Sequence, residues 1–363
     1  MTVTEQALMG ALQLVVDPNT GRDFVSAKAI KNLSIQDGEV SFEVELGYPA
    51  KSQVAELRKA LVAASRSVAG VSNVSVNISS KIVAHAVQRG VQLLPGVKNI
   101  VAVASGKGGV GKSTTAVNLA LALAAEGASV GLLDADIYGP SQPMMMGIDA
   151  RPESEDGKTM EPLENYGVQV MSIGFLVGQD EAMIWRGPMA TQALEQLLRQ
   201  TNWKDLDYLI VDMPPGTGDI QLTLSQRVPM TGAVIVTTPQ DIALLDAKKG
   251  IKMFEKVGVP ILGIVENMAV HVCSNCGHIE HIFGVDGGKK MATEYGMPYL
   301  GALPLNMQIR LQADSGKPTV VADPEGEVAG IYKTLARQVA VAIAGKNKDF
   351  SSKFPSITIS KDT

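Results

Sequence analysis

The sequence predicts an α/β fold, in which a mostly parallel sheet is flanked by helices, preceded by a small α+β domain. From Lys98 onward, apolar segments of strand length alternate with segments of helical periodicity. Near-continuous apolar strands separated by helices are typical of a parallel sheet that is covered on both faces. A glycine-rich turn, residues 105–111, lies between the first of these strands and the first helix. The first 78 residues have a different order of elements and contain no cysteine.

The N-terminal segment, residues 1–78, predicts the order α-β-β-α-β. Asp17-Pro18-Asn19 ends a helical apolar pattern, because proline cannot continue a helix. Asp37-Gly38 separates two strand-like runs, which is a hairpin signal, and the second run alternates apolar and polar residues as a half-buried strand does. The expected elements are a helix over 4–16, strands over 32–35 and 40–46, a helix over 52–67 and a strand over 74–78, followed by a linker over 79–97.

The rest of the chain predicts one α/β domain over 98–345 and a loose polar tail over 346–363. Strands are expected over 99–104, 129–134, 168–173, 208–212, 233–237, 261–265 and 299–302. Helices are expected over 112–126, 191–200, 241–257, 288–295 and 327–344.

The glycine-rich turn matches G-x-x-x-x-G-K-[ST], a phosphate-binding loop, with Gly106, Gly111, Lys112 and Ser113 in the defining positions. Its glycines allow the backbone N–H groups to point at an anion, and the helix that follows offers its positive end. Lys112 is expected to neutralise the β- and γ-phosphates, and Ser113 to ligate Mg²⁺. A second lysine, Lys107, lies inside the loop, where most such loops have none. The residues expected to contact a nucleoside triphosphate are Gly106, Lys107, Gly108, Gly109, Val110, Gly111, Lys112, Ser113 and Thr114.

Three aspartates lie at the ends of neighbouring predicted strands. Asp212 closes the apolar strand 208–212, an arrangement that supports Mg²⁺ directly or through water. Asp134 and Asp136 lie at the end of the second strand, where the carboxyl edge of a parallel sheet faces its ligand. One of the pair is expected to orient the attacking water and the other to hold Mg²⁺ through its hydration shell, although a strand-end aspartate also serves to cap a turn. The glycines of segment 213–219 suit a loop that follows the γ-phosphate and moves when it leaves.

A short loop holds the residues with soft ligand atoms. Both cysteines and three of the four histidines fall between His271 and His281. Cys273 and Cys276 form C-x-x-C, whose thiolates grip one metal ion or two corners of a cluster. The pair supplies half a coordination sphere, and three interpretations remain open. His278 and His281 complete a zinc site, a second chain brings its own cysteines for the Cys₄ set of a [4Fe–4S] cluster, or the two thiols act as a redox dithiol.

The composition argues against several classes of protein. A net charge of −5 gives no support for nucleic-acid binding. No run of about 18 apolar residues is present, so no membrane span is expected. The N-terminal residues lack the basic start and apolar core of a secretion signal, and two cysteines cannot build a disulfide framework. We therefore expect a cytoplasmic protein.

Four motifs, in order, resemble the Mrp/ApbC family, which are P-loop ATPases of the deviant Walker A class (MinD, ParA, nitrogenase iron protein) that carry iron–sulfur clusters. These motifs are the phosphate-binding loop with Lys107, the segment Asp134–Ser141, the segment Met213–Asp219 and the Cys273/Cys276 pair. The resemblance covers residues 98–344. The first 78 residues resemble the small iron–sulfur-assembly domain often fused ahead of such carriers: Asp17-Pro18 fits, and no cysteine is present.

The resemblance implies a homodimer in which Cys273 and Cys276 of both chains ligate one bridging [4Fe–4S] cluster. It implies that Lys107 reaches the phosphates of ATP, across the dimer, that Asp136 positions the water and that Asn267 contacts adenine. It further implies that an iron–sulfur scaffold and apo-protein clients are partners, and that ATP binding or hydrolysis affects cluster transfer.

Two other functions remain as alternatives. One is a MinD/ParA-like positioning ATPase with a structural zinc site; the tail 346–363 offers no convincing amphipathic helix or basic surface for it. The other is an electron donor of the nitrogenase-iron-protein type, which generally takes its cysteines from two separate loops rather than from C-x-x-C.

Overall fold

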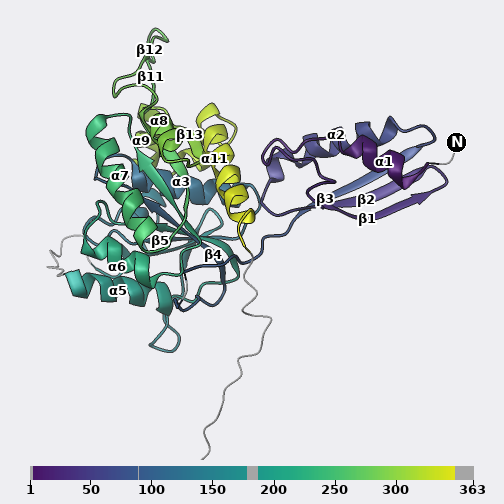
Figure 1. Ribbon diagram of the computed structural model, residues 1–363. Coiled ribbons are helices and arrows are strands. Elements are labelled where there is room, and N and C mark those ends of the chain that lie inside the picture. The colour runs from purple at the N-terminus through teal and green to yellow at the C-terminus, as the bar shows by residue number, and fades with distance from the viewer. Residues whose placement is uncertain (1–2, 89, 178–186, 348–363) are drawn as a thin grey trace, which may run out of the picture.

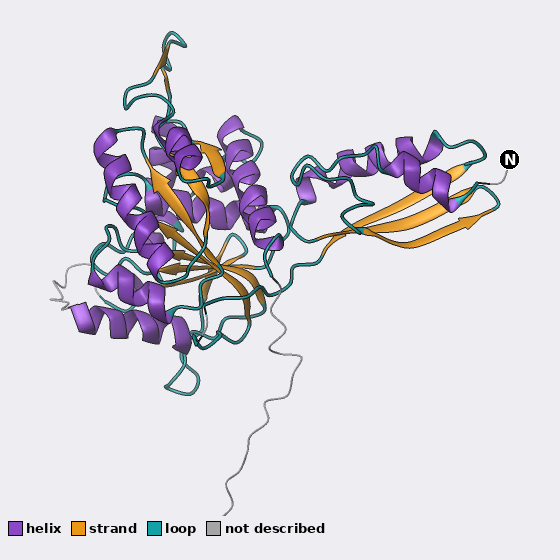
Figure 2. Ribbon diagram, viewed as in Figure 1, coloured by secondary structure: helices purple, strands orange, loops and turns teal. Residues whose placement is uncertain are grey.

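A computed structural model describes residues 3–88, 90–177 and 187–347 of the chain. At the N-terminus, three strands form one sheet in the order β1-β2-β3, with β1 and β2 antiparallel and β2 and β3 parallel. Two helices cover one face of this sheet, as Figure 2 shows. The elements are α1 Glu5–Leu12, β1 Ile30–Gln36, β2 Glu39–Leu46, α2 Val54–Arg66 and β3 Asn73–Ser80. The predicted α-β-β-α-β order is confirmed.

The bounds of the elements in this unit differ from the prediction by a few residues, and two of the differences have a clear structural cause. The helix expected over 4–16 ends at Leu12, because Val16 forms a β-bridge with Asp23 and the chain turns back between them. Strand β1 is longer than expected and contains a bulge between Lys31 and Ser34. Both departures come from backbone pairing with residues that a local pattern does not include.

The second unit is built on an eight-stranded sheet in the order β13-β10-β9-β4-β8-β5-β7-β6, in which every pair is parallel except β6 with β7. The strands are β4 Val97–Ala104, β5 Val130–Asp134, β6 Leu163–Asn165, β7 Val168–Ser172, β8 Leu206–Asp212, β9 Gly232–Thr237, β10 Ile261–Glu266 and β13 Tyr299–Ala302. The helices are α3 Lys112–Ala125, α4 Gln142–Met145, α5 Gly187–Gln200, α6 Asp219–Arg227, α7 Asp241–Lys256, α8 Gly287–Glu294, α9 Met307–Asp314, α10 Thr319–Ala322 and α11 Glu327–Ala344. The predicted α/β class with a mostly parallel sheet is confirmed.

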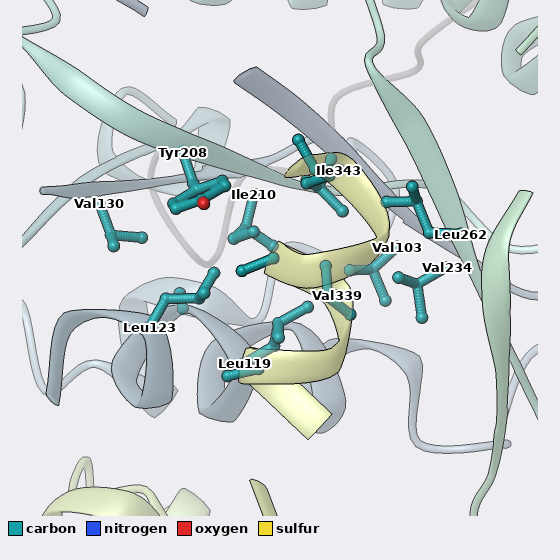
Figure 3. Packing of buried hydrophobic residues seen from close by; sticks show 14 of the residues in the cluster. Val103, Leu119, Leu123, Val130, Tyr208, Ile210, Val234, Leu262, Val339 and Ile343 are labelled. Atoms are coloured by element: carbon teal, nitrogen blue, oxygen red, sulfur yellow. The ribbon is translucent and has the colours of Figure 1, made fainter. Parts of the chain in front are cut away.

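Helices cover both faces of this sheet (Figure 1). On one face α3 packs against α11, and on the other α5, α6 and α7 form a row. Figure 3 shows the apolar packing between these helices and the sheet: Leu119 lies beside Val339, and Leu123 and Ile343 belong to the same buried cluster. All four of these side chains are fully buried. Because both faces are covered, the central strands consist almost entirely of buried apolar residues.

Several elements were not predicted by the sequence pattern. Helices α4 and α10 have four residues each, too few to show a helical period. The longer helices α6 and α9 and the antiparallel edge strand β6 were missed as well. A two-stranded hairpin, β11 His271–Val272 with β12 Ile279–Glu280, forms the loop that carries the cysteines.

The segment that joins the two units is bound to the last described residues of the chain. Within residues 81–88 and 90–96 it has no helix or strand, and the backbone N–H of Ala86 donates to the carbonyl of Asn347, 2.9 Å away. The domain boundaries given above remain our proposal, and residues 348–363 of the predicted tail lie outside the described part of the chain. Within the described residues, no helix is long and apolar enough to cross a membrane.

Candidate nucleotide site and cysteine loop

The phosphate-binding loop occupies the carboxyl edge of the sheet, between β4 and α3. Two glycines are required by its geometry. Gly111, the N-cap of α3, has a φ of 81°, in the left-handed region that favours glycine. Gly106 lies against α7, where an added Cβ would come within 2.1 Å of the backbone of Asp246. The loop is therefore closely held by α7 while its N–H groups remain at the start of a helix, where anions bind.

Lys112 connects the predicted groups of the site. Its side chain is 6% exposed, and its Nζ lies 2.5 Å from Asp212 Oδ1, 3.0 Å from Ser113 Oγ and 3.9 Å from Asp136 Oδ2. Lys112 and Ser113 follow directly after the loop, at the start of α3. Asp212 ends β8 and Asp136 follows β5, and these two strands are adjacent and parallel. The structure thus brings together the lysine, the hydroxyl and two of the three aspartates that the sequence singled out.

Asp134 has a different environment from Asp136. It is fully buried, and its carboxylate accepts hydrogen bonds from the backbone N–H groups of Asp136, Ser141 and Gln142 and from the Ser172 hydroxyl. Burial, and then the nearby charge of Asp212, raises the pKa of Asp134 to about 7. Asp134 therefore fixes the loop that follows β5, and its role toward water or Mg²⁺ remains a prediction.

Asp136 is the carboxylate at the end of β5 that faces Lys112, and its side chain is 14% exposed. Burial raises its pKa, and the ammonium of Lys112 opposes that shift. A partly exposed carboxylate beside the phosphate-binding lysine suits an acceptor for a proton or a water hydrogen.

The other predicted contacts lie around the loop. Lys107 is half-buried, and its backbone carbonyl accepts a hydrogen bond from the Ser105 hydroxyl. Thr114 is half-buried in the first turn of α3. Asn267 follows β10, and its Nδ2 donates to the carbonyl of Val110, 2.8 Å away. The side chain expected at adenine is thus in contact with the loop backbone itself.

Gln142, at the start of α4, is a site residue that the sequence reasoning did not identify. Its side-chain Nε2 donates to Asp212 Oδ2 at 2.8 Å and to the Ser113 carbonyl at 3.1 Å. Its position directly after the segment Asp134–Ser141 was the available indication in the sequence. A glutamine side chain has no distinctive chemistry that would mark it as a site residue.

The cysteine loop projects away from the sheet (Figure 1). Cys276 is exposed and Cys273 is partly exposed, and both thiols are free. The Cys273 backbone N–H donates to the His278 carbonyl, and the Gly277 N–H donates to the Cys273 carbonyl, so the loop is a tight turn. Hydrogen bonds from the N–H groups of Asn275 and Cys276 lower the pKa of Cys273, which favours the thiolate form that binds metals.

The histidines of this loop have other contacts. Nδ1 of His281 lies 3.0 Å from the Ala269 carbonyl, and Nδ1 of His271 lies 3.1 Å from the Leu305 carbonyl. His278 is exposed at the turn, with Nε2 3.9 Å from Glu280 Oε1. Across the three described stretches of the chain, no group of three or more His, Cys, Asp or Glu side chains is placed to hold a metal ion.

Comparisons with known proteins identify the family of both units. The family described as "NUBPL iron-transfer P-loop NTPase" matches residues 96–340, and the family described as "Iron-sulfur cluster assembly protein" matches residues 5–78. An "Iron-sulfur cluster carrier protein" of Escherichia coli (strain K12) is 52% identical over 335 residues, which are 92% of this chain and 91% of that protein.

Among solved structures, a nucleotide-binding protein from Archaeoglobus fulgidus, in complex with ADP, is 36% identical with a TM-score of 0.56, and covers 64% of this chain and 90% of that one. The cell-division ATPase MinD of Pyrococcus furiosus has a TM-score of 0.50 at 22% identity, covers 66% of this chain and 98% of its own, and shows the fold alone. The P-loop fold and the family predicted from the motifs are both confirmed. The chain belongs to the NUBPL iron-transfer P-loop NTPase family, with an iron–sulfur-cluster-assembly-type domain ahead of it.

Proposed function

We propose that this protein binds and hydrolyses ATP and carries an iron–sulfur cluster, which it holds as a [4Fe–4S] centre between two copies of the chain and transfers to apo-proteins. The observation that carries the proposal is the presence in one α/β unit of a phosphate-binding loop beside Lys112, Asp212 and Asp136, and of an exposed pair of thiols. The two are connected by one short segment: Asn267 bonds to the phosphate-binding loop, and Cys273 follows six residues later.

The nucleotide site fits ATP with Mg²⁺ by its donor set. The N–H groups of the loop and the first turn of α3 bind the phosphates, and Lys112 exchanges its contact with Asp212 for one with the β- and γ-phosphates. That exchange frees Asp212 and the Ser113 hydroxyl, which are oxygen ligands of the kind Mg²⁺ prefers. Mg²⁺, when bound, supplies positive charge to the transferring phosphate. Asp136 orients the attacking water, and Lys107 adds a further positive charge to the loop.

The thiols suit a transferable cargo. Cys273 and Cys276 stand in an exposed turn, where a cluster can be received and released. Four aliphatic side chains near them, Val272, Ile279, Ile282 and Val285, are between 51% and 59% exposed. Exposed apolar side chains gathered in this way mark a contact surface, and we assign it to a second copy of the chain, whose two cysteines complete the Cys₄ set.

The partners follow from this chemistry. We propose that an iron–sulfur scaffold supplies the cluster and that apo-proteins receive it. The E. coli relative is named an iron–sulfur cluster carrier protein. We propose that the protein works in the cytoplasm, a reducing compartment in which free thiols persist.

The proposal is tested by cluster transfer. The protein is reconstituted anaerobically with iron and sulfide, mixed with an apo-protein that takes a [4Fe–4S] cluster, and the acceptor is followed by circular dichroism with and without MgATP. We expect transfer from the wild type at a rate that changes with MgATP, and transfer from Lys112→Ala at a rate that does not. Absence of transfer would overturn the carrier function, and equal rates with and without MgATP in the wild type would overturn the link to the nucleotide.

A further inference from the structure

Gln142 lies at the meeting point of three parts of the nucleotide site. Its backbone N–H donates to Oδ2 of Asp134, the last residue of β5, at 3.0 Å. Its side-chain Nε2 donates to Asp212 Oδ2 at 2.8 Å, at the end of β8, and to the Ser113 carbonyl at 3.1 Å, in the first turn of α3. The residue is fully buried, so none of these bonds competes with bulk water.

The orientation of the Gln142 amide is fixed by its partners. A carboxylate and a carbonyl are acceptors only, so the group that faces both must be the NH₂, which has two hydrogens to give. The opposite orientation would place Oε1 against two other oxygens. In the observed orientation Oε1 is buried and has no hydrogen-bond partner within residues 3–88, 90–177 and 187–347. Buried acceptors without a donor are uncommon in folded proteins, and this one lies beside the proposed Mg²⁺ ligands.

The two oxygens of Asp212 have different partners. Oδ1 is 2.5 Å from Lys112 Nζ, and Oδ2 is held by Gln142. When the nucleotide takes Lys112 away, Oδ1 loses its partner, whereas the bond from Gln142 to Oδ2 does not depend on the lysine. The same amide also holds the backbone of Ser113, whose hydroxyl is the other proposed Mg²⁺ ligand.

We infer that Gln142 is a positioning residue for the divalent cation: its amide fixes the Asp212 carboxylate relative to Ser113, and so sets the geometry that Mg²⁺ meets with the nucleotide. The inference rests on the proposed function, because it assumes that Asp212 and Ser113 serve Mg²⁺. Residues that orient metal ligands through hydrogen bonds contribute about 10- to 100-fold to metal affinity in other proteins.

The test is the Mg²⁺ dependence of ADP binding, measured as the rise in melting temperature of the full chain during a MgCl₂ titration at fixed ADP. Gln142→Met keeps the length of the side chain and removes both donated hydrogen bonds. We expect the Mg²⁺ midpoint to rise by about tenfold or more, and this rise to exceed any weakening of ADP binding measured without Mg²⁺. Gln169→Met is the matched control, because Gln169 also donates from its amide to a backbone carbonyl, that of Lys204, but lies away from the site on β7.

A second background shows whether Gln142 acts through Asp212. When Gln142→Met is introduced into the Asp212→Asn variant, it should shift the Mg²⁺ midpoint much less than it does in the wild type. The effects of substitutions at two residues in contact do not add when one residue acts through the other. Gln142→Asn retains the amide on a side chain one methylene shorter, so the amide no longer reaches both acceptors, and it should shift the midpoint in the same direction.

The outcomes separate the two claims. An unchanged midpoint in folded Gln142→Met or Gln142→Asn, or an equal shift in the Asp212→Asn background, would overturn the role of Gln142 and leave the proposed function standing. A wild-type protein whose melting temperature does not respond to ADP with Mg²⁺ would overturn the proposed function itself.

Discussion

Lys112 Nζ and Asp212 Oδ1 lie 2.5 Å apart, so the lysine of the phosphate-binding loop is paired with the carboxylate at the end of the adjacent strand β8. The pair is buried, with side chains 6% and 0% exposed. The ammonium and the carboxylate therefore neutralise each other in the absence of nucleotide. A triphosphate with Mg²⁺ offers phosphate oxygens to Lys112 and the cation to Asp212.

Lys112→Ala should lower ATP turnover by about 100-fold or more, because a fixed positive charge at the transferring phosphate is lost. Steady-state phosphate release checks this. Lys98→Ala is the control, since Lys98 makes a 2.7 Å pair with Asp207 on the same sheet but is 45% exposed. Turnover that stays unchanged in Lys112→Ala would remove the phosphate-binding loop from the reaction.

The stability of the nucleotide-free protein should fall as the pH rises toward neutrality. The fold favours protonated Asp134, whose pKa is raised from 3.8 to about 7, so the native state holds more protons than the unfolded state between those values. The favourable contribution of the proton is complete at low pH and is lost as the pH rises through about 7. Asp134→Asn has no such proton, so its melting temperature should fall less between pH 5 and pH 8. Parallel pH profiles for the two proteins would contradict this assignment.

The N-terminal unit forms hydrogen bonds with a buried ion pair of the sheet unit. Arg337 on α11 lies 2.5 Å from Glu126 at the end of α3, and the same guanidinium donates to Ser52 Oγ and Asn19 Oδ1 of the N-terminal unit. Arg337→Met should cost about 3–5 kcal/mol of unfolding free energy, because Glu126 would be left buried without its cation. Denaturant unfolding measures the loss.

Two variants control for the Arg337 prediction. Arg310→Met breaks an exposed pair with Asp314 and should change stability by at most about 0.5 kcal/mol. Glu126→Gln combined with Arg337→Met removes both charges and should recover part of the loss. A single Arg337→Met variant as stable as the wild type would show that the pair does not hold the units together.

His278→Ala/His281→Ala should retain the iron–sulfur cluster. His281 is hydrogen-bonded to the Ala269 carbonyl at the base of the hairpin, and His278 lies at its exposed turn. Iron and sulfide analysis after anaerobic reconstitution checks this against the wild type. Loss of all bound metal in the double variant would favour the zinc site formed with the two histidines.

Much of the fold follows from local pattern. The strands β4, β8 and β9 are apolar runs because both faces of the sheet are covered, and the glycines of the loop show where the first strand turns into a helix. The site residues that the sequence identified are those with intrinsic chemistry: Lys112, Ser113 and the strand-end aspartates. The roles of those residues remain predictions.

The rest depends on contacts between distant parts of the chain. Gln142 and Asp212 are 70 residues apart and Glu126 and Arg337 are 211 apart, so no local periodicity reports either pair. The local pattern of Asp17-Pro18-Asn19 predicts the end of a helix but none of the contacts of this turn. The Asp17 carboxylate accepts from the Tyr48 hydroxyl within the N-terminal unit, and Asn19 Oδ1 accepts from Arg337 of the sheet unit.

The most direct test is metal analysis combined with native mass spectrometry after anaerobic reconstitution, on the wild type and on Cys273→Ala/Cys276→Ala. We predict about four iron and four sulfide for each pair of wild-type chains, and loss of the iron, the visible absorbance and the cluster-bridged dimer in the double variant. One zinc ion per single chain, resistant to exchange with iron, would contradict the account.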